Sequence, residues 1–364
     1  MKNTVLFAQR ACVSVRATFV ITVVVAMFVA AVPLAILIMA QEGHSSGKKA
    51  PEVNARQYRL SGPFTHDNLT IFLIHGPNQI EGKNFLTLQE ALEQKKVVVY
   101  ETKDVNELAI ENRSHEDVYV QAGDIVKGGQ QDRVLAVDLI VPPKSGKIPI
   151  TAFCVEQGRW SRRGEEKVDT FGSSAEVVNT KDLKLAAKKA NSQGAVWENV
   201  KVAQDKMSQN VGEAVASRTS SSSLQLALEN TKLNQTAEAY MQALGSIVKG
   251  KSDVIGYVFA INGKVNSADV YASNQLFNKL WPKLLKANAT EAIAELQKDQ
   301  KFEPTSEASV KKFLTDSEQG TGSEKEVTKR VGLLTREDKE NVFFETRDRD
   351  AKGAWIHRNY IRKE

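Results

Sequence analysis

The chain has 364 residues, of which 41% are hydrophobic, and this is enough for one large domain or two ordinary ones with a real core. A disordered chain is thereby excluded. The formal net charge is +5, but Lys2, Arg10 and Arg16 lie in the first 40 residues, where there is no Asp or Glu. The other 46 basic residues nearly balance 44 acidic ones, so overall charge gives no case for nucleic-acid binding.

The first predicted element is an apolar helix over residues 17–40, which contain no charged side chain. A helix of that length spans about 36 Å, enough for a hydrocarbon core of about 30 Å. Because the positive charges precede it, residues 1–16 are expected in the cytoplasm and the rest of the chain outside it, held by a single-pass membrane anchor. A cleaved signal peptide, which would make the protein secreted, and a buried soluble helix are the alternatives.

Residues 41–57 are polar, contain Gly and Pro, and are typical of a tether. A folded domain is expected over residues 58–362, beginning with a β-rich part at 58–160. Its short runs of β-branched and aromatic residues are separated by turn signals too close together for parallel crossovers, so the strands are predicted to be antiparallel. Thr87 and Glu90 form a capping box that predicts a short helix between two strands.

A helical part is predicted over residues 174–246, with Ser223 as an N-cap after the loop at 220–222. A hairpin and a helix follow at 253–290, with the hairpin turn at Asn262 and Gly263. Residues 317–326 are polar and are expected to form a loop, and residues 327–362 contain three strand candidates. The expected fold class is therefore α+β: a transmembrane helix, a mainly antiparallel β-rich half, a helical middle, and a C-terminal hairpin and meander.

Known catalytic and metal motifs are not found in the sequence. The five histidines are scattered without metal-ligand spacing, and there is no dinucleotide fingerprint, phosphate loop or serine elbow. No metal and no cofactor are therefore predicted. Cys154 is the one cysteine beyond the apolar leader, and its apolar surroundings favour a small buried hydrophobe over a nucleophile.

Two stretches, "GGQQDR" and "CVEQGRW", remain as a candidate polar site at strand ends. The Gly128–Gly129 pair could bring backbone amides close to an anion, and two arginines could bind it in bidentate fashion. A carboxylate near an arginine could act as general acid or base. The predicted catalytic residues are Glu156 and Asp132, and the predicted ligand-binding residues are Lys127, Gly128, Gly129, Gln131, Arg133, Arg159 and Trp160, the last as a stacking face.

Three interpretations of these residues remain open. The first is a binding module for a small anionic ligand, such as a nucleotide or sugar phosphate, with Arg133 and Arg159 as anion clamps. The second is a hydrolase that uses Glu156 or Asp132 as general base. The third is a structural or protein-interaction domain in which Asp132 and Glu156 pair with Arg159 and Arg133 to hold a bulged hairpin. Apart from the membrane and a small ligand, no partner is indicated.

The segments "AGDIVKGGQQDRVL", "FCVEQGRW" and "GYVFAINGKVNSADVY" resemble an uncharacterised bacterial family. It is named the ARG- and rhodanese-phosphatase-superfamily-associated protein domain, where ARG stands for ADP-ribosylglycohydrolase. The resemblance covers roughly residues 58–362. Because the family has no established activity, it implies no catalytic residue, only a contextual association with ADP-ribose and phosphate chemistry.

Overall fold

The computed structural model describes residues 54–80, 82–298 and 300–363. The predicted membrane segment at 17–40 and most of the tether lie outside these residues, so the anchor stays a prediction. Within the described ranges, no helix combines the length and the apolar character needed to cross a membrane.

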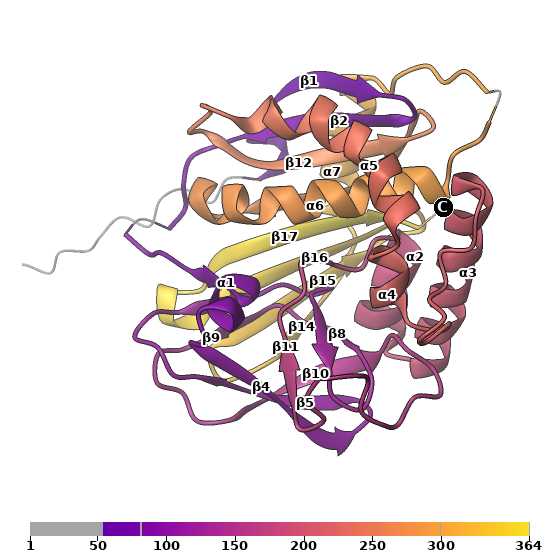
Figure 1. Ribbon diagram of the computed structural model, residues 1–364. Helices are drawn as coiled ribbons and strands as arrows, with labels where there is room; N and C mark the ends of the chain where they lie inside the picture. Colours follow the sequence, from indigo (N-terminus) through magenta and orange to yellow (C-terminus); the bar gives the residue numbers. More distant parts are fainter. Residues whose placement is uncertain (1–53, 81, 299, 364) are drawn as a thin grey trace, which may run out of the picture. The chain divides into compact units, whose positions relative to one another are not determined.

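The largest element of the fold is an eight-stranded antiparallel sheet (Figure 1). Its first two strands pair with a hairpin from the middle of the chain, and the last four come from the C-terminal meander. The spatial order is β1 (Arg59–His66), β2 (Leu69–His75), β12 (Val254–Ile261), β13 (Lys264–Tyr271), β17 (Ala354–Arg362), β16 (Asn341–Asp348), β15 (Val331–Glu337) and β14 (Thr321–Glu326).

A second group of short strands closes into a six-stranded barrel. The order around it is β10 (Ile148–Cys154), β5 (Glu107–Asn112), β4 (Val97–Asp104), β11 (Thr170–Gly172), β7 (Ile125–Gly128) and β8 (Arg133–Leu135). A three-stranded sheet contains β3 (Leu86–Thr87), β6 (Val118–Val120) and β9 (Leu139–Val141), in which β3 and β6 are parallel.

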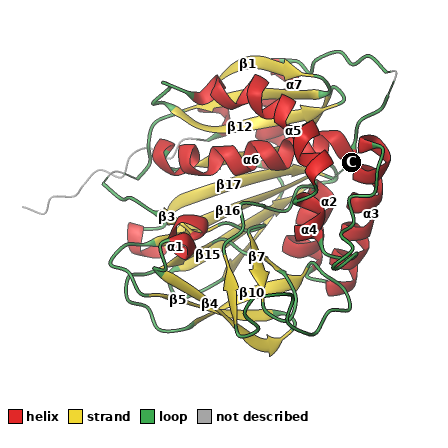
Figure 2. Ribbon diagram, in the orientation of Figure 1, coloured by secondary structure: helices red, strands yellow, loops and turns green. Residues whose placement is uncertain are grey.

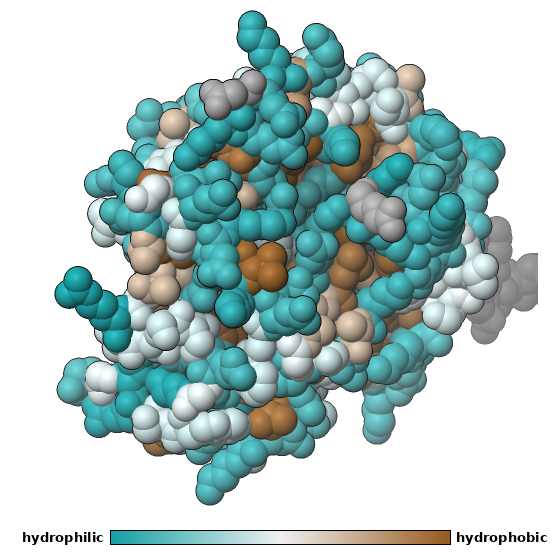
Figure 3. Space-filling model, turned by 90° about the vertical axis from the view of Figure 1, so that its right-hand side faces the viewer, coloured by the Kyte–Doolittle hydropathy of each residue, from teal (hydrophilic) through white to brown (hydrophobic). Residues whose placement is uncertain are grey.

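The helices connect and cover these sheets (Figure 2). They are α1 (Leu88–Glu93), α2 (Lys181–Leu185) with a π-helical turn at Ala186–Ala190, α3 (Gln193–Val211), α4 (Leu224–Leu228), α5 (Thr231–Leu244), α6 (Asn274–Ala294) and α7 (Glu307–Ser317). In the part of the chain that the structure describes, short 3₁₀ segments lie at Ala55–Gln57, Gly245–Val248 and Arg349–Ala351. The molecular face in Figure 3 is mainly hydrophilic with separate apolar areas, as expected when the large apolar side chains are in the core.

Helices α6 and α7 cover opposite faces of the large sheet. Phe277 of α6 stacks on Tyr271 of β13, and that ring stacks in turn on His357 of β17. Phe313 of α7 instead contacts Tyr360, which is three residues further along β17. Because side chains alternate between faces along a strand, an odd separation places His357 and Tyr360 on opposite sides. The sheet therefore buries both faces, and its interior strand β12 is apolar and buried throughout.

A buried charged group joins the large sheet to the smaller one. The imidazole of His357 lies between two carboxylates, with Nδ1 2.9 Å from Asp138 and Nε2 3.0 Å from Asp269. Asp138 immediately precedes β9, whereas Asp269 lies on β13. The Thr346 hydroxyl also donates to Asp138 at 2.6 Å, and Asn359 donates to Asp269 at 2.8 Å. Each carboxylate is thus held by several donors, as buried charges require.

These contacts favour the protonated form of His357. Burial alone favours the neutral imidazole, but the charges and hydrogen bonds of Asp138 and Asp269 raise the pKa of His357 above its ordinary value. Both ring nitrogens then donate, which only the imidazolium can do. Lys188 lies nearby and donates to Asn359 at 3.1 Å. The adjoining cavity measures 10 Å³, about the space of one water, so this group is a structural connection.

Most of the sequence-based expectations for the fold of the described residues are confirmed. The α+β class and the antiparallel pairing hold, with β3–β6 as a parallel exception. The capping box at Thr87, the Ser223 N-cap and the left-handed turn at Asn262 and Gly263 are present. Cys154 is fully buried, and its burial raises the pKa of the thiol to about 11.

Two features differ from expectation. Residues 317–326 were expected to form a loop, but this was wrong: Ser317 ends α7 and Thr321–Glu326 forms edge strand β14. All six residues of β14 are exposed, so the strand is held by backbone pairing with β15 and needs no apolar alternation. The barrel was also not predicted, because closure depends on pairings between strands distant in the sequence.

We expect His357→Asn to lower the free energy of unfolding by about 3–5 kcal/mol at pH 6, because it leaves two buried carboxylates without their cation. His115→Asn is the matched control, since His115 is exposed. Urea denaturation monitored by circular dichroism measures both. Equal stability of the two variants would contradict the structural role.

The buried His357 and Asp138 also make the free energy of unfolding depend on pH in a defined direction. Because the pKa of His357 is raised in the folded state, its stabilisation is complete below about pH 6.5 and is lost as the pH rises through the folded pKa. The pKa of Asp138 is lowered, since the charge and hydrogen bond of His357 outweigh the effect of burial. Its stabilisation is therefore lost below about pH 4. Urea denaturation across pH should show the alkaline loss in the parent and not in His357→Asn.

Candidate functional site

The predicted site residues lie at one end of the barrel. Lys127 and Gly128 end β7, Arg133 begins β8, and the loop from Val155 onward follows β10. Because β8 pairs with β10 at Arg133 and Cys154, the turn before β8 lies beside the loop after β10. The structure thus brings Asp132 close to Glu156 and Arg159, as the sequence suggested, and adds Arg163.

Asp132 is completely buried and surrounded by donors. Arg163 donates to both of its oxygens, at 2.7 and 2.8 Å. The Gly128 amide donates to Oδ1 at 3.0 Å, and the Ser223 hydroxyl donates to Oδ2 at 2.9 Å. Burial raises the pKa of Asp132 above its ordinary value, and the Arg163 guanidinium opposes that shift.

Glu156 is equally buried and equally paired. Arg159 approaches its two oxygens at 2.8 and 2.7 Å, and the Asp132 amide donates to Oε2 at 3.1 Å. Burial opposes ionisation, but the hydrogen bonds from Arg159 and Ser220 outweigh it and lower the pKa of Glu156. Every carboxylate oxygen of both residues therefore has a donor. The general-base interpretation stays a prediction, and this geometry offers it no open oxygen.

Arg133 and Lys127 point to other partners. Arg133 is fully buried, donates to the Val105 carbonyl at 2.6 Å, and pairs with Glu101 at 3.3 Å instead of with Glu156. Lys127 pairs with Glu229, the residue after α4, at 2.7 Å. The structural pairing expected between Asp132, Glu156 and two arginines is therefore present, but Arg163 takes the place of Arg133.

The glycine pair has a packing role. Gly129 has a φ of +57°, and a Cβ there would lie 2.3 Å from the ring of Phe171. Its amide donates to the Lys167 carbonyl at 3.0 Å, and the Gly128 amide is used by Asp132. Both amides are thus engaged within the protein, whereas the sequence suggested that they face an anion.

Gln131 and Trp160 have contrasting environments. Gln131 is fully buried, and neither polar atom of its side chain has a hydrogen-bond partner within the described ranges. Trp160 is 52% exposed, a rare position for a large aromatic side chain in this protein. Of the predicted ligand-binding residues, Trp160 is the one whose ring is open to a stacking partner.

A surface depression lies over the buried ion pairs. It has a volume of 560 Å³ and is formed by two loops, residues 157–164 after β10 and residues 218–222 before α4. Its charged lining residues are all arginines, and hydroxyl groups supply most of the rest: Arg159, Arg162, Arg163, Arg218, Ser161, Thr219, Ser220, Ser221 and Ser222. The serine run was expected to be only a loop, because nothing local in the sequence relates it to the barrel.

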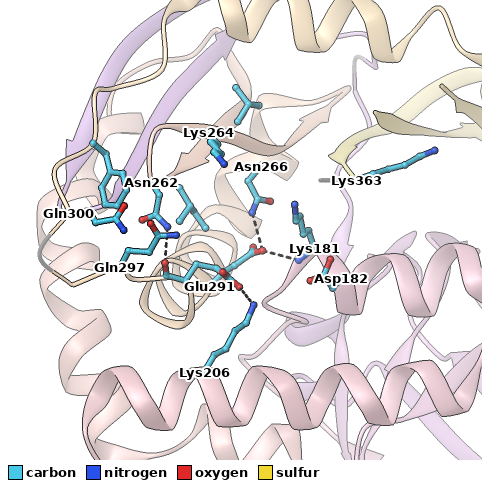
Figure 4. Close-up of a pocket in the computed structure, with 14 residues that line it drawn as sticks. Lys181, Asp182, Lys206, Asn262, Lys264, Asn266, Glu291, Gln297, Gln300 and Lys363 are labelled. Atoms are coloured by element: carbon cyan, nitrogen blue, oxygen red, sulfur yellow. Dashed lines mark hydrogen bonds and ion pairs between the residues drawn. The ribbon is translucent and has the colours of Figure 1, made fainter. Parts of the chain in front are cut away.

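A second cavity, of 620 Å³, lies beside the turn of the β12–β13 hairpin (Figure 4). The sequence predicted the hairpin but not the cavity. Its buried carboxyl, Glu291, belongs to α6, where charged residues usually indicate the solvent-facing side of a helix. No local signal identifies Glu291, because its burial results from packing against distant elements. Among the described residues, no group of three or more His, Cys, Asp or Glu side chains could hold a metal ion.

Among the comparisons with known proteins, a family model matches the chain. No curated protein and no solved structure matches it. The family described as the ARG and Rhodanese-Phosphatase-superfamily-associated Protein domain matches residues 57–361, which include the barrel, the arginine-lined depression, all of the large sheet except Arg362, and all of the second cavity except Lys363. That range agrees with the resemblance found at "GGQQDR" and "CVEQGRW". The chain therefore belongs to this family of associated domains.

Proposed function

We propose that the protein binds a small phosphate-bearing ligand, such as a nucleotide, in the arginine-lined depression at the end of the barrel. One observation carries this proposal: the depression is lined by four arginines and no carboxylate. Guanidinium groups and hydroxyls are the side-chain donors best suited to phosphate oxygens. Binding is favoured over hydrolysis because Asp132 and Glu156 have no oxygen left to activate water.

The arginines divide into two roles. Arg159 and Arg163 are held by Glu156 and Asp132, so they build the floor of the depression. The side chain of Arg162 is 55% exposed and pairs with Glu165, whose side chain is fully exposed. Such a pair contributes little and is readily exchanged for a ligand. Arg218 is exposed and has no ion pair in the part of the chain that the structure describes. Direct phosphate contacts are therefore assigned to Arg162 and Arg218.

Trp160 supports a ligand with a planar ring. It lies between Arg159 and Ser161, both of which line the depression, and its indole is half-exposed. Stacking on an indole face contributes about 1–3 kcal/mol for a nucleobase. A phosphate on Arg162 and Arg218 together with a base on Trp160 would explain why a large aromatic side chain is left in water beside a basic depression.

We expect ADP to quench the fluorescence of Trp160 in a saturable way. The double variant Arg162→Ala, Arg218→Ala should weaken binding about tenfold to a hundredfold, because each charge-assisted hydrogen bond contributes about 1.5–3 kcal/mol before compensation. Arg56→Ala is the control, since Arg56 is also an exposed arginine but does not line the depression. Fluorescence titration at 50 mM and 200 mM salt measures the affinity. Unchanged affinity in the double variant would exclude this site.

The floor of the depression gives a separate stability prediction. Arg163→Ala should lower the free energy of unfolding by about 3–5 kcal/mol, because it leaves Asp132 buried without its main cation. Arg218→Ala should leave it unchanged within about 0.5 kcal/mol, as is usual for an exposed side chain. Thermal and urea unfolding of both variants test this difference. Similar losses in both would mean that Arg218 belongs to the structural pairing, and the ligand contact assigned to it would be wrong.

A further inference from the structure

The cavity of Figure 4 is built by elements far apart in the sequence. The β12–β13 hairpin supplies Asn262, Lys264 and Asn266, α6 supplies Glu291, and the start of α2 supplies Lys181. Its 620 Å³ is in the range of small-molecule sites, which commonly measure about 300–1,000 Å³. Polar groups from three elements thus converge on one space.

Glu291 is the unusual residue of this cavity. Its side chain is 1% exposed, and one oxygen accepts hydrogen bonds from the Lys181 amide at 2.9 Å and from Asn266 at 3.0 Å. Its other oxygen, Oε2, has no partner within the described ranges. Figure 4 shows the carboxyl group directed toward Asn266 and Lys181. A buried carboxyl oxygen without a donor is costly, so a ligand that supplies a donor would be favoured.

This carboxyl contrasts with Asp132 and Glu156, whose oxygens are all occupied. Burial raises the pKa of Glu291 above its ordinary value, although Lys184 and the hydrogen bonds from the Lys181 amide and Asn266 oppose the shift. The group therefore keeps its proton to a higher pH than an exposed glutamate. In that form it can donate a hydrogen bond as well as accept one, which suits a hydroxyl group.

Two of the lysines that line the cavity are free to meet an anion. Lys206 is paired with Glu295 at 2.6 Å, and Lys363 is paired with Glu337 and points away from the cavity in Figure 4. Within the described residues, neither Lys181 nor Lys264 has an ion pair. Of the other lining carboxylates, Glu295 is occupied by Lys206, and Asp182 is exposed. The free charges in the cavity therefore favour an anionic group near the hairpin.

We propose that this cavity is a second ligand site, which binds a hydroxylated anion of sugar-phosphate size. Its anionic group contacts Lys181 and Lys264, and one of its hydroxyls bonds to Oε2 of Glu291. Asn262 and Asn266 provide further polar contacts, and the half-buried ring of Phe302 provides an apolar wall. This site does not depend on the arginine-lined depression, from which it differs in every lining residue.

Three probes test the anion contacts and the hydroxyl contact separately: glucose 6-phosphate, glucose and inorganic phosphate. By isothermal titration calorimetry, glucose 6-phosphate should bind more tightly than either of the others. Lys264→Ala should weaken it about tenfold, since one charge-assisted contact is lost. Lys329→Ala is the matched control, because Lys329 is also exposed but does not line the cavity.

Glu291→Gln keeps the size of the side chain and an acceptor for the Lys181 amide, so it tests Oε2 without removing the packing. This variant should lower the affinity for glucose 6-phosphate and leave the affinity for inorganic phosphate unchanged. These titrations use the Arg162→Ala, Arg218→Ala background, which removes the phosphate contacts assigned to the depression, and glucose 6-phosphate should still bind there through the cavity. The inference is overturned if no probe binds at 10 mM in that background, or if Lys264→Ala binds like Lys329→Ala.

Discussion

The structure depends on the placement of one imidazolium between two buried carboxylates. Asp138, Asp269 and His357 come from three segments that are distant in the sequence, and together they connect the β9 region to the large sheet. Because each charge is compensated and hydrogen-bonded, the group is stable in a low-dielectric interior, where an uncompensated member would be costly. It fixes the position of the smaller sheet relative to β13 and β17, and Tyr271 stacks on its imidazole to continue the core.

The end of the barrel follows the same physical rule. Two carboxylates and two guanidiniums are buried together, and every carboxylate oxygen has a donor. Ser223 joins this cluster to the helical part of the chain, because its hydroxyl donates to Asp132 while accepting from the Leu226 amide at the start of α4. The loop that carries Arg218 is thereby held next to the loop that carries Arg162, so the depression is a consequence of the ion pairs below it.

The candidate binding surfaces differ from the structural clusters in having lining groups that are exposed or lack a buried partner. In the depression these are the exposed guanidiniums of Arg218 and of Arg162, which pairs with the exposed Glu165. In the cavity of Figure 4 they are one carboxyl oxygen and two lysines. Saturated clusters such as Asp132–Arg163 give stability and leave no capacity for a ligand. Only groups with unused donors or acceptors can exchange their contacts for those of a ligand.

Sequence patterns alone predict the α+β class, the Asn262–Gly263 hairpin, the helix caps at Thr87 and Ser223, and the closeness of Asp132 to Glu156 and Arg159. These features follow from local periodicity, turn chemistry and neighbouring strands. Long-range contacts instead produce barrel closure, edge strand β14, the pairing of Asp132 with Arg163 in place of Arg133, and the burial of Glu291 and His357. Each depends on pairing between residues far apart in the chain, and a single sequence carries no local pattern for such contacts.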